Sequence, residues 1–126
     1  MALFPEREII TAAGHRNWDE VKRIIDRNPS AMWLERGITG KTTASFAALA
    51  GNLEILQSML DKISSLSLPP EQHERILRET FETPDHKNNT PILMASVSSF
   101  ECLAFLVQHC PNGVALLDVA NDNGTL

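Results

Sequence analysis

The sequence lacks the features that mark several classes of protein. Its only cysteines are Cys102 and Cys110, and without a second pair they form neither a zinc-binding pattern nor a disulfide framework. This scarcity favours a reducing compartment. No apolar run approaches the roughly 18 residues that a membrane-spanning helix needs. The first ten residues already carry Glu6, Arg7 and Glu8, so we expect no secretory signal peptide.

Basic residues are also scarce. Lys and Arg number 11 against 16 Asp and Glu, which gives the chain a formal net charge of -5 at pH 7. Nucleic acids and anionic membrane surfaces attract proteins through a concentrated basic face, so neither is expected as a partner. The composition of the 126 residues, 43% hydrophobic and 21% charged, is ordinary for a single globular domain.

The sequence does contain a pair of short helices within residues 40–60. Gly51 and Asn52 separate them, because glycine readily takes the left-handed conformation that closes a helix. The connecting turn is short, so the two helices are predicted to pack antiparallel. The apolar positions at helical spacing are Phe46, Ala47, Ala48 and Ala50 in the first helix and Ile55, Leu56, Met59 and Leu60 in the second.

The same pattern occurs in two further places. Thirty-five residues before Asn52, Asn17 holds the equivalent position, and two alanines precede it as they precede Asn52. Forty-eight residues after Thr42, Thr90 opens another copy, whose inter-helix turn is one residue shorter. Residues 121–126 have the opening pattern of a fourth copy. A register kept through three copies is more specific than any single motif.

These copies resemble ankyrin repeats, whose pattern of about 33 residues is D-x-x-G-x-T-P-L-H-x-A-A-x-x-G-H-x-E-I-V-x-x-L-L. The matching positions are Gly40, Thr42, Ala47, Ala48, Gly51, Glu54, Ile55 and Leu60 in one copy and Asp85, Thr90, Pro91 and Ala95 in the next, with Ile92, Leu103, Leu106 and Val107 as conservative equivalents. The resemblance implies an all-α fold, an ankyrin-repeat solenoid of antiparallel helix pairs joined by β-hairpin-like turns. Ser45 and Leu93 replace the family's histidine, and Thr43-Ala44 its Pro-Leu, which implies a less rigid stack.

The repeats divide the chain into segments. We predict one domain over residues 1–126, with an N-terminal cap repeat at 5–30, a repeat at 37–62, an inserted helix at 69–82, a repeat at 85–110 and the start of a further repeat at 121–126. Phe4-Pro5-Glu6 is predicted to start the first helix, since proline is tolerated in a first turn. Ser64 to Ser67 is predicted to be a flexible linker. The inserted helix is expected to cover the outer surface of the stack, with docking of a partner as the alternative. Because a last repeat needs a polar outer face, we expect the chain to be a fragment of a longer protein.

The resemblance also implies where a partner would bind. Repeat solenoids bind proteins on an extended concave surface, and the family's contact positions, carried onto this chain, are Ile38, Thr39, Lys41, Leu49, Ala50, His86, Lys87, Asn89, Val97 and Ser98. Lys41, His86 and Lys87 make this surface mildly basic, which predicts an acidic or mixed partner segment. Trp18, near the first inter-helix turn, and Trp33, in the loop before residue 37, are interpreted as packing residues in preference to binding anchors.

Other motifs do not point to chemistry. Gly37 to Thr42 has two residues between its glycines, whereas a phosphate-binding loop needs four. None of the four histidines is paired at i, i+4 with another metal ligand on a convincing face. Asp85 and His86 are adjacent on a predicted turn, and no serine or cysteine nucleophile has a recognisable setting nearby. Cys102 is expected to be a buried thiol. We therefore predict no catalytic residue, no metal site and no cofactor.

Together these observations predict a protein-protein interaction module rather than an enzyme. We expect a monomeric, intracellular and cytoplasmic protein whose partner is another protein of unknown identity. One alternative is the targeting or substrate-recruiting portion of a larger enzyme, such as a bacterial effector acting in a host cell. Another is a binder of nucleotides or other small molecules, which the spacing between Gly37 and Gly40 argues against.

Overall fold

The computed structural model describes residues 8–122, with side chains described through residue 117, and it is all-helical over that range. The helices are α1 (Glu8–Gly14), α2 (Trp18–Arg27), α3 (Ala31–Leu34), α4 (Thr43–Ala50), α5 (Leu53–Ser65), α6 (Pro70–Phe81), α7 (Pro91–Ser96), α8 (Phe100–His109) and α9 (Gly113–Asp122). The described part contains no β-strand, which confirms the predicted all-α class. None of its helices combines the length and the apolar character needed to cross a membrane.

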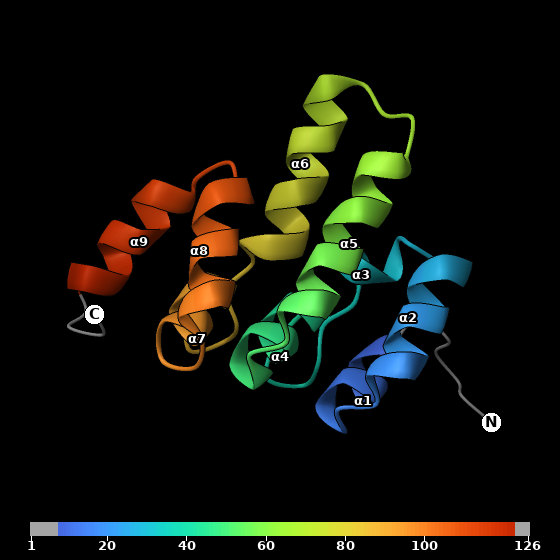
Figure 1. The fold of residues 1–126 in the computed structure, drawn as a ribbon, viewed down its shortest axis with the longest axis horizontal. Helices are drawn as coiled ribbons and strands as arrows, with labels where there is room; N and C mark the ends of the chain where they lie inside the picture. The colour runs from blue at the N-terminus through green and yellow to red at the C-terminus, as the bar shows by residue number, and fades with distance from the viewer. Residues whose placement is uncertain (1–7, 123–126) are drawn as a thin grey trace.

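Six of the helices form two rows. Helices α1, α4 and α7 pack side by side in one row, which we call the inner row, and α2, α5 and α8 pack side by side in a second, the outer row. Figure 1 shows the inner row along the lower edge of the molecule and the outer row above it. Each inner helix also packs against the outer helix that follows it in the chain. The arrangement is therefore a stack of three helix pairs.

The helix pairs begin at unequal intervals, because α6 and its flanking segments separate the second pair from the third. Helix α2 begins at residue 18 and the second pair begins at residues 43 and 53, so the second helix of a pair recurs after 35 residues. The third pair begins at residues 91 and 100, which are 48 and 47 residues further on. The turn itself is not shorter, contrary to the prediction from the sequence pattern: three residues separate α7 from α8, against two between α4 and α5, and α7 is two residues shorter than α4.

Side-chain caps fix these starting points. At each of five helix starts, a short polar side chain accepts a hydrogen bond from the backbone amide three residues on, which satisfies an amide that the helix leaves unpaired. The five caps and their distances are Asn17 (3.4 Å), Thr42 (3.2 Å), Asn52 (3.1 Å), Thr90 (3.2 Å) and Ser99 (3.2 Å). Equivalent caps recur at equivalent positions in successive pairs.

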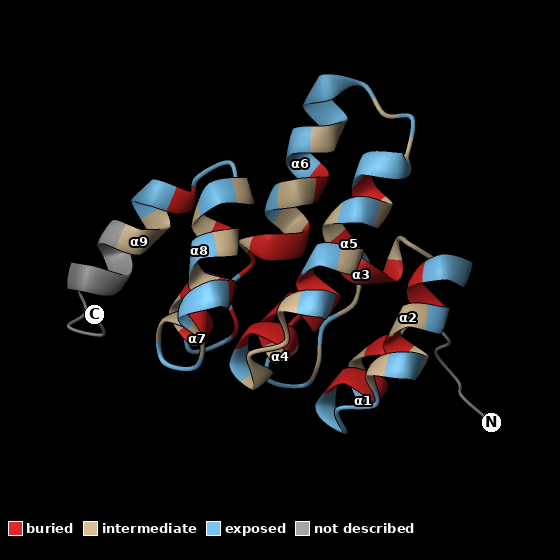
Figure 2. Ribbon diagram, viewed as in Figure 1, coloured by how far each residue is buried: buried red, intermediate tan, exposed pale blue. Residues whose placement is uncertain are grey.

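The core lies between the two rows and differs in kind on its two sides. Figure 2 shows the buried residues where the rows face each other. The inner row contributes mainly small side chains, namely Ala12, Ala13, Ala44, Ala47, Ala48 and Ala95, together with the larger Ile9, Ile92 and Met94. The outer row contributes larger ones, namely Val21, Ile24, Ile25, Ile55, Leu56, Met59, Ile63 and Leu106. Small residues on one side allow close helix packing, and the larger ones fill the space between the rows.

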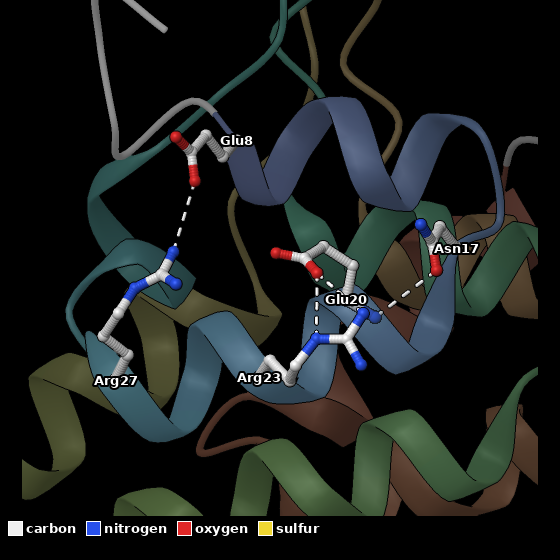
Figure 3. Close-up of polar contacts among 5 residues, drawn as sticks. All are labelled: Glu8, Asn17, Glu20, Arg23 and Arg27. Atoms are coloured by element: carbon white, nitrogen blue, oxygen red, sulfur yellow. Dashed lines mark hydrogen bonds and ion pairs between the residues drawn. The ribbon is translucent and has the colours of Figure 1, made fainter. Parts of the chain in front are cut away.

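Ion pairs tie the exposed edges of the first two helix pairs. Figure 3 shows Arg27, at the end of α2, bonded to Glu8 at the start of α1, with 3.2 Å between the guanidinium and carboxylate atoms. Between α2 and α5, Lys22 pairs with Glu54, and Lys62 lies 3.4 Å from Asp26. Exposed pairs of this kind stabilise a fold only slightly. Here they give Lys22, Arg27 and Lys62 carboxylate partners.

Helix α6 lies between α5 and α8 in Figure 1, within the segment expected to be an inserted helix. The ring of its last residue, Phe81, packs edge-on against Phe105 of α8, with 6.4 Å between ring centroids. Glu82 follows and accepts hydrogen bonds from both the backbone amide and the side-chain amide of Asn112, at 2.7 and 2.9 Å. These contacts connect the insertion to the third helix pair.

The structure corrects three further expectations. Ser64 and Ser65 belong to α5 rather than to a flexible linker, because buried Ile63 holds the last turn of that helix against the core. Trp33 lies in the one-turn helix α3 rather than in a loop. Residues 113–122 form α9, so the first two residues of the predicted fourth repeat at 121–126 are helical. The remainder of that repeat, and the predicted helix start at 4–6, lie outside the described residues.

Candidate functional site

The turns that precede α4 and α7 have the same backbone hydrogen bonds. We call Gly37–Lys41 the first tip and Asp85–Asn89 the second tip. In each, the first residue donates its amide to the carbonyl of the fifth, at 2.9 Å in the first tip and 3.0 Å in the second. The fourth residue donates to the carbonyl of the first, at 2.9 Å in both. Its φ is positive, +84° at Gly40 and +67° at Asn88. A turn closed by a left-handed residue is typical of three-residue hairpin loops.

The two tips contact each other directly. The amide of His86 donates to the carbonyl of Thr39 at 2.9 Å. A Cβ at Gly40 would lie 2.9 Å from the His86 backbone nitrogen and 2.6 Å from its ring. Such a distance is too short for any side chain, so glycine is required both by the positive φ and by the approach of the second tip. The first tip is therefore shaped by its neighbour as well as by its own sequence.

Asp85 organises the second tip. Its side chain is buried, and one carboxylate oxygen accepts hydrogen bonds from the amides of Lys87 and Asn89, both at 2.9 Å. The other oxygen lies 3.2 Å from the ammonium group of Lys41 in the first tip. Burial alone would raise the pKa of Asp85. The Asn89 amide, Lys41 and the Lys87 amide outweigh it, so the pKa is lower than the ordinary value.

The predicted contact residues fall into two groups. Those on the tips are brought together, with Ile38 93% exposed and Thr39, His86 and Lys87 also exposed. Lys41 and Asn89 are half-buried. The other group lies where α4 and α7 end, about 12 Å away along an eight-residue helix.

At these helix ends the neighbouring repeats are again joined. The hydroxyl of Ser98, after α7, donates to the carbonyl of Ala48 in α4. Leu49 and Val97 hold equivalent positions and are 42% and 66% exposed. Ser98 is exposed and Ala50 half-buried. The predicted surface is therefore two clusters, each bridged by one hydrogen bond between repeats.

The charge of this surface differs from the expectation. Lys41 was expected to contribute to a mildly basic patch, but its ammonium group pairs with the buried carboxylate of Asp85. The positive charges on or beside the tips that remain without an ion-pair partner among the described side chains are those of Lys87 and Arg36. Lys87 is exposed, and neither it nor Arg36 forms an ion pair with any side chain that the structure describes.

One feature beside the first tip was missed from the sequence. A pocket of about 320 Å³ lies between α1, α4 and the tip, and its lining residues are Ile10, Thr11, Arg36, Gly37, Ile38, Thr39 and Phe46. Only Ile38 and Thr39 belong to the predicted contact set. The sequence feature that could have indicated the pocket is Gly37. It occupies the first position of its tip, where the second tip has Asp85, and therefore places no side chain beside α1.

The residues considered from the sequence as nucleotide-binding, nucleophilic or metal-binding candidates have structural roles or no matching cluster in the described residues. In the segment Gly37 to Thr42, the amide of Gly37 donates to the carbonyl of Lys41 and the amide of Gly40 donates to the carbonyl of Gly37. Burial raises the pKa of the Cys102 thiol, and burial followed by the charge of Glu82 raises the pKa of Cys110. Over the described residues, no cluster of three or more His, Cys, Asp or Glu side chains could hold a metal ion. Trp18 and Trp33 pack, half-buried, against the core.

No protein-family model, curated protein or solved structure matches the chain.

Proposed function

We propose that the chain is a protein-binding module of the ankyrin-repeat type, which receives its partner on the two tips and the ends of α4 and α7. The observation that carries the proposal is the repetition of one tip, with the same hydrogen bonds and the same left-handed position, 48 residues apart. Direct bonding between the tips presents their side chains as one continuous array. Solenoid proteins use such arrays of repeated positions for recognition.

The exposed hydrophobic residues support the location. Among the described residues, six large hydrophobic side chains are exposed, and three of them, Ile38, Leu49 and Val97, hold the expected contact positions. The three others are Leu34, Phe100 and Val114. Scattered exposed hydrophobics are normal on a protein surface. Their concentration at a small set of repeated positions favours a surface that becomes buried on binding.

The distribution of charge supports an acidic or mixed partner. The outer row carries ion pairs between α2 and α5, which cancel the charges of Lys22 and Lys62. Lys87 on the second tip is exposed, with no ion pair to any described side chain. Unpaired cations steer acidic partners and speed their association. A negatively charged chain that leaves Lys87 unpaired on its second tip, and Arg36 unpaired beside the first, among the described side chains, has the electrostatics to attract acidic segments there.

The test compares binding to two matched variants. Proteins retained from cell lysate by the native chain are identified, and the Kd of a purified one is measured. The tip variant is Ile38→Asp with Lys87→Glu. The control is Leu34→Asp with Arg78→Glu, which likewise replaces an exposed aliphatic residue by Asp and an exposed cation by Glu, at positions outside the tips. Lys41 is left in place, because reversing its charge beside buried Asp85 would unfold the tips.

We expect the tip variant to bind at least about tenfold more weakly, because it removes an apolar contact and reverses an unpaired charge. The control variant should bind as the native chain does. Both variants are first checked for unchanged thermal unfolding. Equal binding by all three proteins would reject the tips as the binding surface.

A further inference from the structure

The pocket beside the first tip combines an apolar interior with a single charge. Ile10 of α1 and Phe46 of α4 line it and are half-buried, with their other faces packed against the core. Ile38 and Thr39 form its border on the side of the first tip. Arg36 is the one charged residue among the seven that line it, and its side chain is exposed.

Gly37 keeps this pocket open. A Cβ at Gly37 would lie 3.2 Å from the Cγ2 atom of Ile10, closer than side chains normally approach. In the second tip the same register position holds Asp85, whose side chain turns back onto its own tip. The first tip has no such side chain, so the space beside α1 stays accessible.

The size and position of the pocket indicate its occupant. About 320 Å³ is at the lower end of the range for ligand sites, which suits one side chain better than a cofactor. The pocket is continuous with Ile38, which is 93% exposed at the edge of the proposed binding surface. Arg36 has no ion-pair partner among the described side chains, and an unpaired guanidinium at the border of an apolar pocket is complementary to a carboxylate.

We propose that this pocket takes one apolar side chain of a protein partner, from a segment in which an adjacent aspartate or glutamate pairs with Arg36. The proposal rests on the proposed function, since it specifies which partner segment the first tip selects. The apolar side chain is buried against Ile10 and Phe46, and the carboxylate sets its orientation. The outer row offers no equivalent site for an acidic residue in its ion-paired region, because Lys22 and Lys62 there already have carboxylate partners.

A peptide selection tests the proposal and does not require the partner to be identified first. A random peptide library displayed on phage is selected on the full chain, and the Kd of each enriched peptide is measured by fluorescence anisotropy. Two variants alter the pocket: Arg36→Glu reverses its charge, and Thr11→Phe fills it from an exposed position on α1. The controls are Arg78→Glu and Ser64→Phe, which make comparable changes at exposed positions on α6 and α5.

The expected peptides carry Asp or Glu beside an apolar residue. They should bind about tenfold more weakly to Arg36→Glu and to Thr11→Phe, and equally well to both controls. Their affinity for the native chain should fall as salt concentration rises.

Two other outcomes overturn the proposal and differ in what they leave standing. Peptides whose binding is lost on His86→Glu or Lys87→Glu but kept on Arg36→Glu and Thr11→Phe would reject the pocket and retain the tips as a binding surface. Failure to enrich any peptide, or enriched peptides that bind every variant equally, would reject the pocket and count against the proposed function as well.

Discussion

The two tips share their backbone hydrogen bonds and a left-handed fourth residue, and their sequences differ at all five positions, with the largest consequence at the first. The first tip begins with Gly37, and the second begins with Asp85. Asp85 uses its carboxylate to hold two amides of its own tip and the ammonium group of Lys41. Gly37 has no side chain to do this, and the space beside it is an accessible pocket. Both tips have the same internal backbone hydrogen bonds; the second adds bonds to the Asp85 side chain, and the first is also held by contacts from the second.

Under the proposed function, this difference separates stability from recognition: the second tip stabilises the fold, and the first binds the partner. The second tip stabilises the first, through the bond from the His86 amide to Thr39 and through the pair between Asp85 and Lys41. With its conformation fixed in this way, the first tip can expose Ile38 and leave its pocket unfilled. A rigid binding surface loses less conformational entropy when a partner docks. Changes to the second tip should therefore reduce stability. In the first tip, changes at Gly40 should reduce stability, and changes at Ile38 should weaken binding.

The largest effect is expected from Asp85→Ala. It leaves the amides of Lys87 and Asn89 without their acceptor and Lys41 without its buried partner, at a cost of about 3 kcal/mol in the free energy of unfolding. Urea unfolding followed by circular dichroism measures the loss. Asp61→Ala, an exposed aspartate on α5, serves as the control and should change stability by less than about 0.5 kcal/mol. A similar small change for Asp85→Ala would show that the carboxylate does not hold the tips together.

Gly40→Ala should be the next most damaging change. Alanine is disfavoured at a φ of +84°, and its Cβ would collide with the backbone nitrogen of His86, so we expect a loss of about 2 kcal/mol. Gly14→Ala is the matched control, because a Cβ there meets only the ring of Phe46 at an ordinary 3.9 Å. That variant should be neutral or slightly stabilising. Equal stability of the two variants would contradict the close approach of the tips.

Asn88 tests whether the second tip requires its left-handed residue. Asn88→Ala should destabilise by about 1 kcal/mol, because alanine lacks asparagine's tolerance of a φ of +67°. Asn88→Gly should leave stability within about 0.5 kcal/mol of the native chain, since glycine takes this conformation freely. Thermal unfolding of the three proteins side by side measures the difference. If alanine is tolerated as well as glycine, the tip does not enforce the positive φ.

Local signals in the sequence predicted much of the stack. Gly51 was expected to end a helix in the left-handed conformation, and its φ is +70°. Asn17 and Asn52 were expected at equivalent positions, and each caps the start of an outer helix. Helix caps and left-handed helix ends depend on a few neighbouring residues, so they can be predicted from the local sequence. The all-α class, which the resemblance to ankyrin repeats implied, is confirmed over the described residues.

Features that depend on distant contacts were not predicted. Lys41 and Asp85 are 44 positions apart, and nothing near either residue indicates that they pair. Helix α9 was not predicted and packs against α7 and α8; at its first residue, Gly113, a Cβ would lie 2.2 Å from the carbonyl oxygen of Val107 in α8, so glycine permits this close packing. The pocket likewise requires α1 and the first tip to meet, and no local motif encodes that meeting. The ion pair, helix α9 and the pocket all depend on contacts between separate elements of the fold, which the local sequence does not reveal.

The smallest effect should come from acid, because protonation removes the charge of Asp85 but keeps its oxygens as hydrogen-bond acceptors. The folded pKa of Asp85 is lowered, so its contribution to stability is complete above the unfolded value of about 3.9 and is lost as pH falls through the folded value. Subtracting the unfolding free energy of Asp85→Asn from that of the native chain at each pH cancels the other carboxylates. We expect this difference to be constant from about pH 7 to pH 5 and to shrink below about pH 4. A difference that stays constant down to about pH 2, well below the ordinary value, would mean that the Asp85 carboxylate is not stabilised by Lys41 and the two amides.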